Sequence, residues 1–325
     1  MKTDFQKADL FAVAPMVDVT TSTFRRIARL FTKKAMLYTE MIAADAIVHG
    51  KDELLEFDPG EQPLTLQLGG SDPEKLAFAA KAGERLGYSV INLNAGCPSD
   101  KVQSGAFGAV MMKDPEHLAD CIKAMQDAVS IPVTVKTRIG YDDCDSFEFT
   151  QKLIGAIHDA GCRHIIVHAR KCWLNGLSPK ENRTKPPLDY SRVYALKEIF
   201  PDTAFTINGG ITSIEQCKEH LKHVDGVMLG REIIDNPYIM AEVDAKLFNN
   251  GSLIKAREQI LQEAAELIKS YEDHGGKFRY MGQHLLNLFS GCQGARAYRR
   301  YLSEHLGDAH GEEVLLKAFS FCKRS

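Results

Sequence analysis

Short apolar runs, each bounded by Gly, Pro or polar residues, recur eight times along roughly the first 230 residues. Helical segments separate them, and two of these open with a capping residue followed by proline, at Asp72-Pro73 and Asp114-Pro115. Every gap is long enough for the crossover that parallel strands require. We therefore expect strands at residues 11–16, 35–39, 64–68, 90–93, 133–136, 164–168, 205–208 and 227–229. Eight strands alternating with helices over this length predict an α/β fold, the (β/α)8 TIM barrel.

A doubly wound sheet is the structural alternative. It predicts a GxGxxG turn after the first strand, whereas the first strand here runs into Pro15-Met16-Val17-Asp18, so the barrel is favoured. From about residue 250 onward the pattern predicts one helix after another, for example at residues 255–271 and 282–289, with a last one at 312–321 and no convincing strand. We therefore expect a barrel domain over residues 1–249 and a C-terminal all-helical domain over residues 250–325, with the boundary in the Asn-Asn-Gly turn at 249–251.

The composition suits a large globular protein: 325 residues, of which 44% are hydrophobic and 26% charged. The first residues lack the apolar stretch of a signal peptide, and no run reaches the ~18 apolar residues of a membrane span. We therefore expect a cytoplasmic protein without membrane attachment. The eight cysteines form no CxxC pair and no zinc spacing, which predicts free thiols and no metal site.

Basic residues cluster in two places, although the formal net charge is only −3. Residues 274–303 contain no Asp or Glu but include Lys277, Arg279, Arg296, Arg299 and Arg300. A second cluster surrounds Trp173 in a loop and consists of Arg170, Lys171, Lys180, Arg183 and Lys185. Such clusters permit a phosphate-rich partner. On charge alone, an ordinary solvated surface is the better interpretation.

One cysteine stands at the end of a predicted strand, in the stretch VINLNAGCPSDKVQSGAFG. A free cysteine usually packs as a small hydrophobe in the core. Around Cys97, however, Asn94, Ser99 and Asp100 are polar, while Gly96 and Pro98 favour a loop. The carboxyl ends of barrel strands carry the chemistry in this fold, so Cys97 is a candidate catalytic residue.

Further polar residues and glycines follow the other predicted strands. They are Pro15 and Met16; Gln67; Lys136 and Arg138; His168 and Arg170; Asn208, Gly209 and Gly210; and Gly230 and Arg231. The loops after strands 7 and 8 usually form the phosphate site of a barrel. Glycine N–H groups and an Arg231 guanidinium there are suited to an anion, which predicts a phosphate-bearing cofactor.

Residues at the remaining strand ends narrow the choice of cofactor. Lys136 could be a Schiff-base nucleophile, or a fixed charge that tunes the redox chemistry of an electron-rich ring. Gln67 and His168 could hydrogen-bond the edge of a flat heterocycle, although a histidine at such a position can also be an ordinary core residue. Together these residues favour flavin mononucleotide (FMN).

Several motifs resemble those of the tRNA-dihydrouridine synthases, and the similarity extends over nearly the whole chain. They are APMVDVTTSTFRR, QLGG, NLNAGCPSDKVQSGAFGAVMM, VKTRIGYDD, IIVHARK, NGGI and GREI. The segments at residues 171–190 and 294–304 resemble the subfamily that acts on D-loop uridines 20 and 20a of tRNA. The NAGCPS core is the most specific of these motifs.

The resemblance implies a set of site residues. FMN would be held by Pro15, Met16, Val17, Gln67, Lys136, His168, Asn208, Gly209, Gly210, Gly230 and Arg231. Contacts to tRNA would come from Asn94, Lys180, Arg183, Arg296 and Arg299. NADPH would reduce FMN, which would pass hydride to uridine C6 while Cys97 protonates C5. A thiol with the usual pKa of about 8.5 is mostly protonated near neutral pH and can act as this acid. The target uridine would be flipped out of the folded tRNA.

Other functions remain open from the residues themselves. A flavin enzyme acting on a free pyrimidine such as dihydroorotate would share the flavin site, but it gives no reason for basic C-terminal helices. An aldolase would use Lys136 as its Schiff-base nucleophile. A non-catalytic tRNA-binding protein would not need Cys97. No obligate protein partner is evident.

Overall fold

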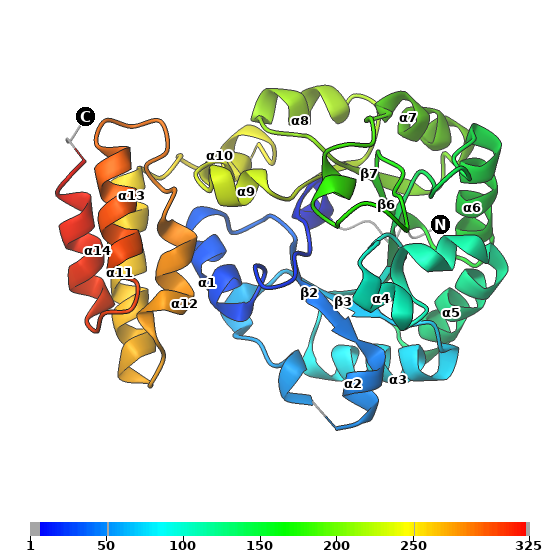
Figure 1. Cartoon of the computed structure of the whole chain (residues 1–325), viewed down its shortest axis with the longest axis horizontal. Helices are drawn as coiled ribbons and strands as arrows, with labels where there is room; N and C mark the ends of the chain where they lie inside the picture. Colours follow the sequence, from blue (N-terminus) through cyan, green and yellow to red (C-terminus); the bar gives the residue numbers. More distant parts are fainter. Residues whose placement is uncertain (1–6, 51, 250, 323–325) are drawn as a thin grey trace.

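The computed structural model describes residues 7–50, 52–249 and 251–322, and its centre is a barrel of eight parallel strands (Figure 1). The strands are β1 (Phe11–Val13), β2 (Leu37–Ala43), β3 (Leu64–Gly69), β4 (Val90–Asn94), β5 (Val133–Arg138), β6 (His164–His168), β7 (Ala204–Asn208) and β8 (Gly226–Leu229). From β2 to β8 each strand pairs with the next in the chain, and β8 pairs with β1. A parallel bridge between Ala12 and Met36 closes the circle. The predicted TIM barrel is confirmed.

The first two strands differ most from the prediction, and the ends of the other strands lie within two residues of it. The first strand ends at Val13 instead of residue 16, because Pro15 lacks the N–H that would continue the ladder after the bond from Ala14 N to Leu229 O (2.8 Å). The second begins later and continues to Ala43, through a register shift between Tyr38 and Met41. A β-bulge of this kind leaves no clear signature in an apolar run.

Helices surround the barrel between the strands, as Figure 1 shows. They are α1 (Ser22–Phe31), α2 (Ala44–Val48), α3 (Pro73–Leu86), α4 (Asp100–Ser104), α5 (Pro115–Ala128), α6 (Phe147–Asp159), α7 (Tyr190–Ile199), α8 (Ile214–His220), α9 (Glu232–Asp235) and α10 (Ile239–Lys246). The predicted caps of α3 and α5 are present. Asp72 accepts from the N–H of Glu74 (3.0 Å), and Asp114 accepts from the N–H of His117 (3.0 Å).

Four helices follow at the C-terminal end and form a group beside the barrel in Figure 1. They are α11 (Arg257–Asp273), α12 (Phe278–Gly282), α13 (Ala295–Glu304) and α14 (Gly311–Phe319), and the described residues after 250 contain no strand. The prediction of a helix at 282–289 was wrong: α12 ends at Gly282, a single 3-10 turn follows (Gln283–Leu285), and the chain then loops to α13. Hydrogen bonds tie this group to the barrel, including Asn287 Nδ2 to Ile234 O (2.9 Å) and Lys255 Nζ to Leu30 O (3.1 Å).

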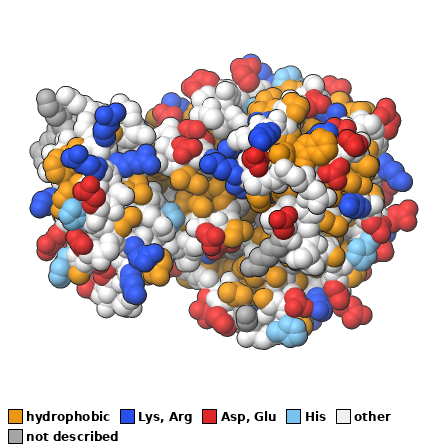
Figure 2. All heavy atoms as spheres, in the orientation of Figure 1, with side chains coloured by type: hydrophobic (Ala, Val, Ile, Leu, Met, Phe, Trp, Pro, Cys, Tyr) orange, Lys and Arg blue, Asp and Glu red, His pale blue; other side chains and the backbone are white. Residues whose placement is uncertain are grey.

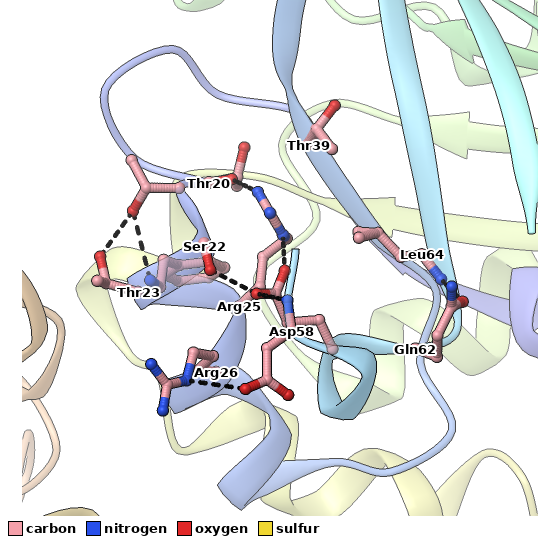
Figure 3. Close-up of polar contacts among 12 residues, drawn as sticks. Thr20, Ser22, Thr23, Arg25, Arg26, Thr39, Asp58, Gln62 and Leu64 are labelled. Carbon is pink, nitrogen blue, oxygen red and sulfur yellow. Dashed lines mark hydrogen bonds and ion pairs between the residues drawn. The ribbon is translucent and has the colours of Figure 1, made fainter. Parts of the chain in front are cut away.

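A buried ion pair fixes α1 against the segment before β3 (Figure 3). Arg25 Nε lies 2.6 Å from Glu61 Oε2, and both side chains are almost completely buried. Ser22 Oγ donates to the other carboxylate oxygen, and Arg25 Nη1 donates to Thr20 O (2.6 Å). Since residues 15–20 connect β1 to α1, this network also holds the loop that follows β1.

Side chains along the strands alternate between the barrel interior and the surrounding helices. Along β4, Val90, Asn92 and Asn94 point inward, whereas Ile91 and Leu93 pack against the helix layer. The inward-facing side chains of β4 therefore change from apolar at Val90 to polar toward its carboxyl end. Within the described residues, no helix is both long and apolar enough to cross a membrane.

Candidate functional site

A cavity of about 1080 Å³ opens at the carboxyl ends of the strands. Its wall includes most of the residues that the sequence singled out: Pro15, Met16, Val17, Gln67, Asn94, Cys97, Lys136, His168, Arg183, Asn208, Gly209, Gly210, Gly230 and Arg231. Lys180, Arg296 and Arg299 do not line it. Residues separated by more than 200 positions in the sequence therefore share one site, because the barrel brings its strand ends together.

Cys97 lies in the cavity wall, partly exposed, on a turn that follows β4. Asn94 shapes this turn, since its Oδ1 accepts from the N–H groups of Gly96 (3.1 Å) and Cys97 (2.9 Å). Asn94 Nδ2 in turn donates to Gln67 Oε1 (2.9 Å), and Gln67 Nε2 donates to Asn92 Oδ1 (2.8 Å). This chain of amides joins the ends of β3 and β4 and fixes where the cysteine backbone stands.

The chain beyond Cys97 folds back tightly onto it. Ala109 N donates to Cys97 O (2.9 Å), and Gly108 adopts a left-handed conformation (φ 73°). A Cβ at Gly108 would lie only 2.6 Å from Cys97 O, so only glycine fits there. Phe107 lines the cavity beside this turn.

Lys136 and His168 face the cavity from neighbouring strands. Lys136 Nζ donates to Asn208 Oδ1 (3.3 Å), and Asn208 Nδ2 donates to Met228 O (2.7 Å). Burial, reinforced by the positive charge of Arg138, lowers the pKa of Lys136 to about 7. Burial also lowers the pKa of His168 well below its usual value, and the nearby cations add to this effect, so the imidazole is neutral at physiological pH.

The turns after β7 and β8 suit a phosphate group. Gly209 (φ 119°) and Gly210 (φ 71°) are left-handed, and a Cβ at Gly209 would lie 2.6 Å from His168 Cδ2. Among the described residues, no backbone hydrogen bond uses the N–H groups of Gly209, Gly210 or Gly230. These donors, with the Arg231 guanidinium in the same wall, can therefore bind an anion.

The charges in the described wall also favour an anionic ligand. Four cationic side chains there form no ion pair with any described carboxylate: Lys136, Arg138, Arg183 and Arg231. The wall contains two carboxylates, and Asp45 is already paired with Lys75 (2.5 Å). A group of at least two negative charges would balance the site. The phosphate and flat-ring requirements of FMN fit these residues.

Two further residues organise the site: the sequence marked Arg138 only as a polar residue near a strand end, and it did not mark Gln103. Arg138 is almost completely buried, and its Nε donates to Gly96 O (2.8 Å), the carbonyl just before Cys97. Gln103, on α4, donates to Pro98 O (2.9 Å), just after Cys97. The period-2 pattern that places Lys136 inward also places Arg138 inward. No sequence signal marks Gln103.

Of the two basic clusters, only Arg183 lines the cavity. In the loop after β6, Lys171 is paired with Asp145 (2.9 Å) and Lys185 with Glu181 (2.6 Å), so only part of this cluster is available to a partner. Arg296, Arg299 and Arg300 border a second cavity of about 490 Å³ between α13 and residues 286–291. Figure 2 shows basic side chains on the C-terminal helices and apolar atoms between this group and the barrel.

No group of three or more His, Cys, Asp and Glu side chains that could hold a metal ion occurs among the residues that the structure describes. All eight cysteines are free, as the sequence predicted.

Comparisons with known proteins agree over almost the whole chain. A family model described as dihydrouridine synthase matches residues 12–322. A protein of Pasteurella multocida named tRNA-dihydrouridine(20/20a) synthase is 50% identical over 312 residues, which cover 96% of this chain and 95% of that protein. A protein of Escherichia coli strain K12 with the same name is 50% identical over 317 residues, covering 97% of this chain and 92% of that protein. One of Shewanella oneidensis is 50% identical over 310 residues, covering 95% and 92%.

Proposed function

This chain belongs to the dihydrouridine synthase family, and we therefore propose that it reduces uridine to 5,6-dihydrouridine in tRNA, at D-loop positions 20 and 20a. The observation that carries this function is a cysteine on the wall of a cationic barrel cavity whose opposite turns suit a phosphate. Family membership decides against the aldolase, the free-pyrimidine enzyme and the non-catalytic binding protein.

The cofactor is FMN, held by the wall residues Pro15, Met16, Val17, Gln67, Lys136, His168, Asn208, Gly209, Gly210, Gly230 and Arg231. The N–H groups of Gly209, Gly210 and Gly230, which have no backbone partner among the described residues, and Arg231 would bind its phosphate, and the amide of Gln67 and the neutral His168 would meet the polar edge of its ring. When bound, FMN supplies hydride for uracil C6 after reduction by NADPH.

The other hydrogen comes from the protein. The Cys97 thiol delivers a proton to uracil C5, so hydride and proton together saturate the C5–C6 double bond. Asn94 supports this step because it holds the N–H groups of Gly96 and Cys97, and thereby keeps the thiol at the cavity wall. Lys136 contributes a positive charge to the cavity when it is protonated.

The tRNA would approach across the cavity mouth. A uridine inside folded tRNA must leave its stack to reach Cys97, so the base is flipped into the cavity. Arg183 stands in the cavity wall, Lys180 lies on the same exposed loop, and Arg296 and Arg299 lie on α13. These four residues would contact phosphates around the flipped nucleotide, while Asn94 would contact the flipped nucleotide on the side of its base.

The test is conversion of unmodified tRNA. We expect the purified protein to be yellow, to release FMN on denaturation, and to convert uridine to dihydrouridine in the presence of NADPH. Mass spectrometry of digested tRNA should show two added hydrogens on the uridine at position 20 and two on the uridine at position 20a. A protein that carries flavin but leaves every tRNA unchanged would overturn the function, and a preparation that flavin cannot load would overturn the cofactor.

A further inference from the structure

The carbonyl groups on either side of Cys97 are both bound by side chains. Arg138 Nε donates to Gly96 O (2.8 Å), and Gln103 Nε2 donates to Pro98 O (2.9 Å). The cysteine is thus held from both directions along the chain. Neither contact is needed to close the turn itself, because Asn94 already binds its N–H groups.

The same two side chains also bind the loop between β6 and α7. Gln103 Nε2 donates to Leu174 O (2.7 Å). Arg138 Nη1 donates to Lys171 O (3.2 Å) and to Asn182 O (3.2 Å). In Figure 1, α4, which carries Gln103, lies beside the chain that follows β6. Each side chain therefore bridges the cysteine turn and residues 171–183.

Residues 171–183 form one connected unit. The buried Asn182 accepts from Trp173 N (2.7 Å) and donates to Trp173 O (2.8 Å) and Leu177 O (3.2 Å). A displacement of one end of this loop is thereby passed to the other. The loop also carries Lys180 and ends in Arg183, which lines the cavity.

We propose that Gln103 and Arg138 are positioning residues that couple the place of Cys97 to the loop that contacts tRNA, so that docking of tRNA on residues 171–183 sets the thiol for proton transfer. This inference rests on the proposed function. It predicts that the two side chains matter for the step that consumes tRNA and not for reduction of the flavin, because NADPH reduces the flavin without a proton from Cys97.

Gln103 offers the cleaner test, since Arg138 also carries charge into the cavity. Gln103→Leu keeps the approximate size of the side chain but removes both donor bonds, and Gln103→Glu removes the donors while keeping the shape. Gln62→Leu is the matched control. Gln62 also binds the backbone, through Gly87 O (2.7 Å) and Leu64 N (2.9 Å), beside which it lies in Figure 3. It precedes β3 and so lies at the end of the barrel opposite to the carboxyl ends of the strands.

Two measurements separate coupling from general destabilisation. We expect Gln103→Leu to lower kcat for tRNA about tenfold, the effect of losing about one good hydrogen bond, with the rate of flavin reduction by NADPH and the KM for tRNA nearly unchanged. Independently of activity, hydrogen exchange should speed up at residues 171–183 and 95–99 together. Gln62→Leu should change neither.

Equal behaviour of Gln103→Leu and Gln62→Leu in both measurements would overturn the inference. Faster exchange at the cysteine turn alone would also overturn it, since the loop would then be independent of Gln103. If the wild-type protein reduces no tRNA, the proposed function fails, whereas the exchange measurement still decides whether the turn and the loop are linked.

Discussion

At the scale of single residues, the charge on Lys136 depends on what enters the cavity. Burial lowers its pKa to about 7, so between pH 7 and 9 most of these side chains are neutral in the absence of an anion. An anion beside Nζ favours the protonated form and raises the pKa, so binding takes up a proton. Anion affinity must therefore increase as pH falls through this range.

This gives a prediction for FMN binding. Between pH 9 and pH 7 the Kd of the wild-type protein should fall severalfold, by up to about tenfold per pH unit, the limit for uptake of one proton. Lys136→Met should bind FMN more weakly with a nearly flat pH dependence. Quenching of flavin fluorescence at fixed ionic strength measures both, and identical slopes for the two proteins would refute the role of Lys136.

The sequence could place residues in one cavity where they lie at or near the carboxyl end of a strand. Lys136, His168 and Asn208 could be placed in one site because a barrel brings these ends together. The bridging role of Gln103 could not be predicted, because it depends on the path of a loop whose contact at Leu174 lies 71 positions away. Local patterns carry no information on such loop contacts.

At the scale of elements, the buried Arg25–Glu61 pair holds α1 against the barrel. We expect Glu61→Gln to lower the free energy of unfolding by about 3–5 kcal/mol, because it leaves a buried guanidinium without its counter-charge. Glu219→Gln makes the same chemical change in the exposed pair with Lys222 and should cost less than about 1 kcal/mol. Urea unfolding compares them, and equal losses would contradict a structural role for the buried pair.

The number of strands was predicted correctly, whereas the boundaries of several strands and C-terminal helices were not. Eight strands were expected and eight occur, because buried parallel strands give short continuous apolar runs. Helix α13 was not singled out, since arginines at 296, 299 and 300 mask the two positions that it buries, Tyr298 and Leu302. The expected helix at 282–289 was misplaced because an apolar stretch does not distinguish a helix from a buried loop.

In the whole molecule, basic residues that are far apart in the sequence lie on the cavity wall and on the C-terminal helices. In the proposed complex, both groups bind the same tRNA. Arg183 belongs to the first cavity, and Arg296 and Arg299 to the second. Hydrogen bonds from Asn287 to Ile234 and from Ser290 to Asp235 join the loop of the second cavity to α9, the helix that directly follows Arg231. The two basic clusters could be recognised in the sequence, but the hydrogen bonds that join the loop of the second cavity to α9 could not.

Each phosphate contact should appear in the salt dependence of tRNA binding. Replacing Arg183, Arg296 or Arg299 by Ala should weaken binding and reduce the slope of log K against log salt by roughly 0.7–0.9 per contact. Lys222→Ala removes an exposed lysine that is already paired with Glu219 and should leave the slope unchanged. If the three arginine variants keep the wild-type slope of log K against log salt, these arginines do not contact tRNA phosphates.

In the proposed reaction, Cys97 protonates a tRNA uridine in this cavity. The most direct measurement is a single-turnover reaction, in which the flavoprotein is first reduced by NADPH and then mixed with unmodified tRNA. Wild type and Cys97→Ala should be reduced by NADPH at the same rate, while the variant should form dihydrouridine about 10²–10⁴ times more slowly, the range expected for loss of a general acid. Formation of dihydrouridine by Cys97→Ala at the wild-type rate would show that Cys97 is not the proton donor.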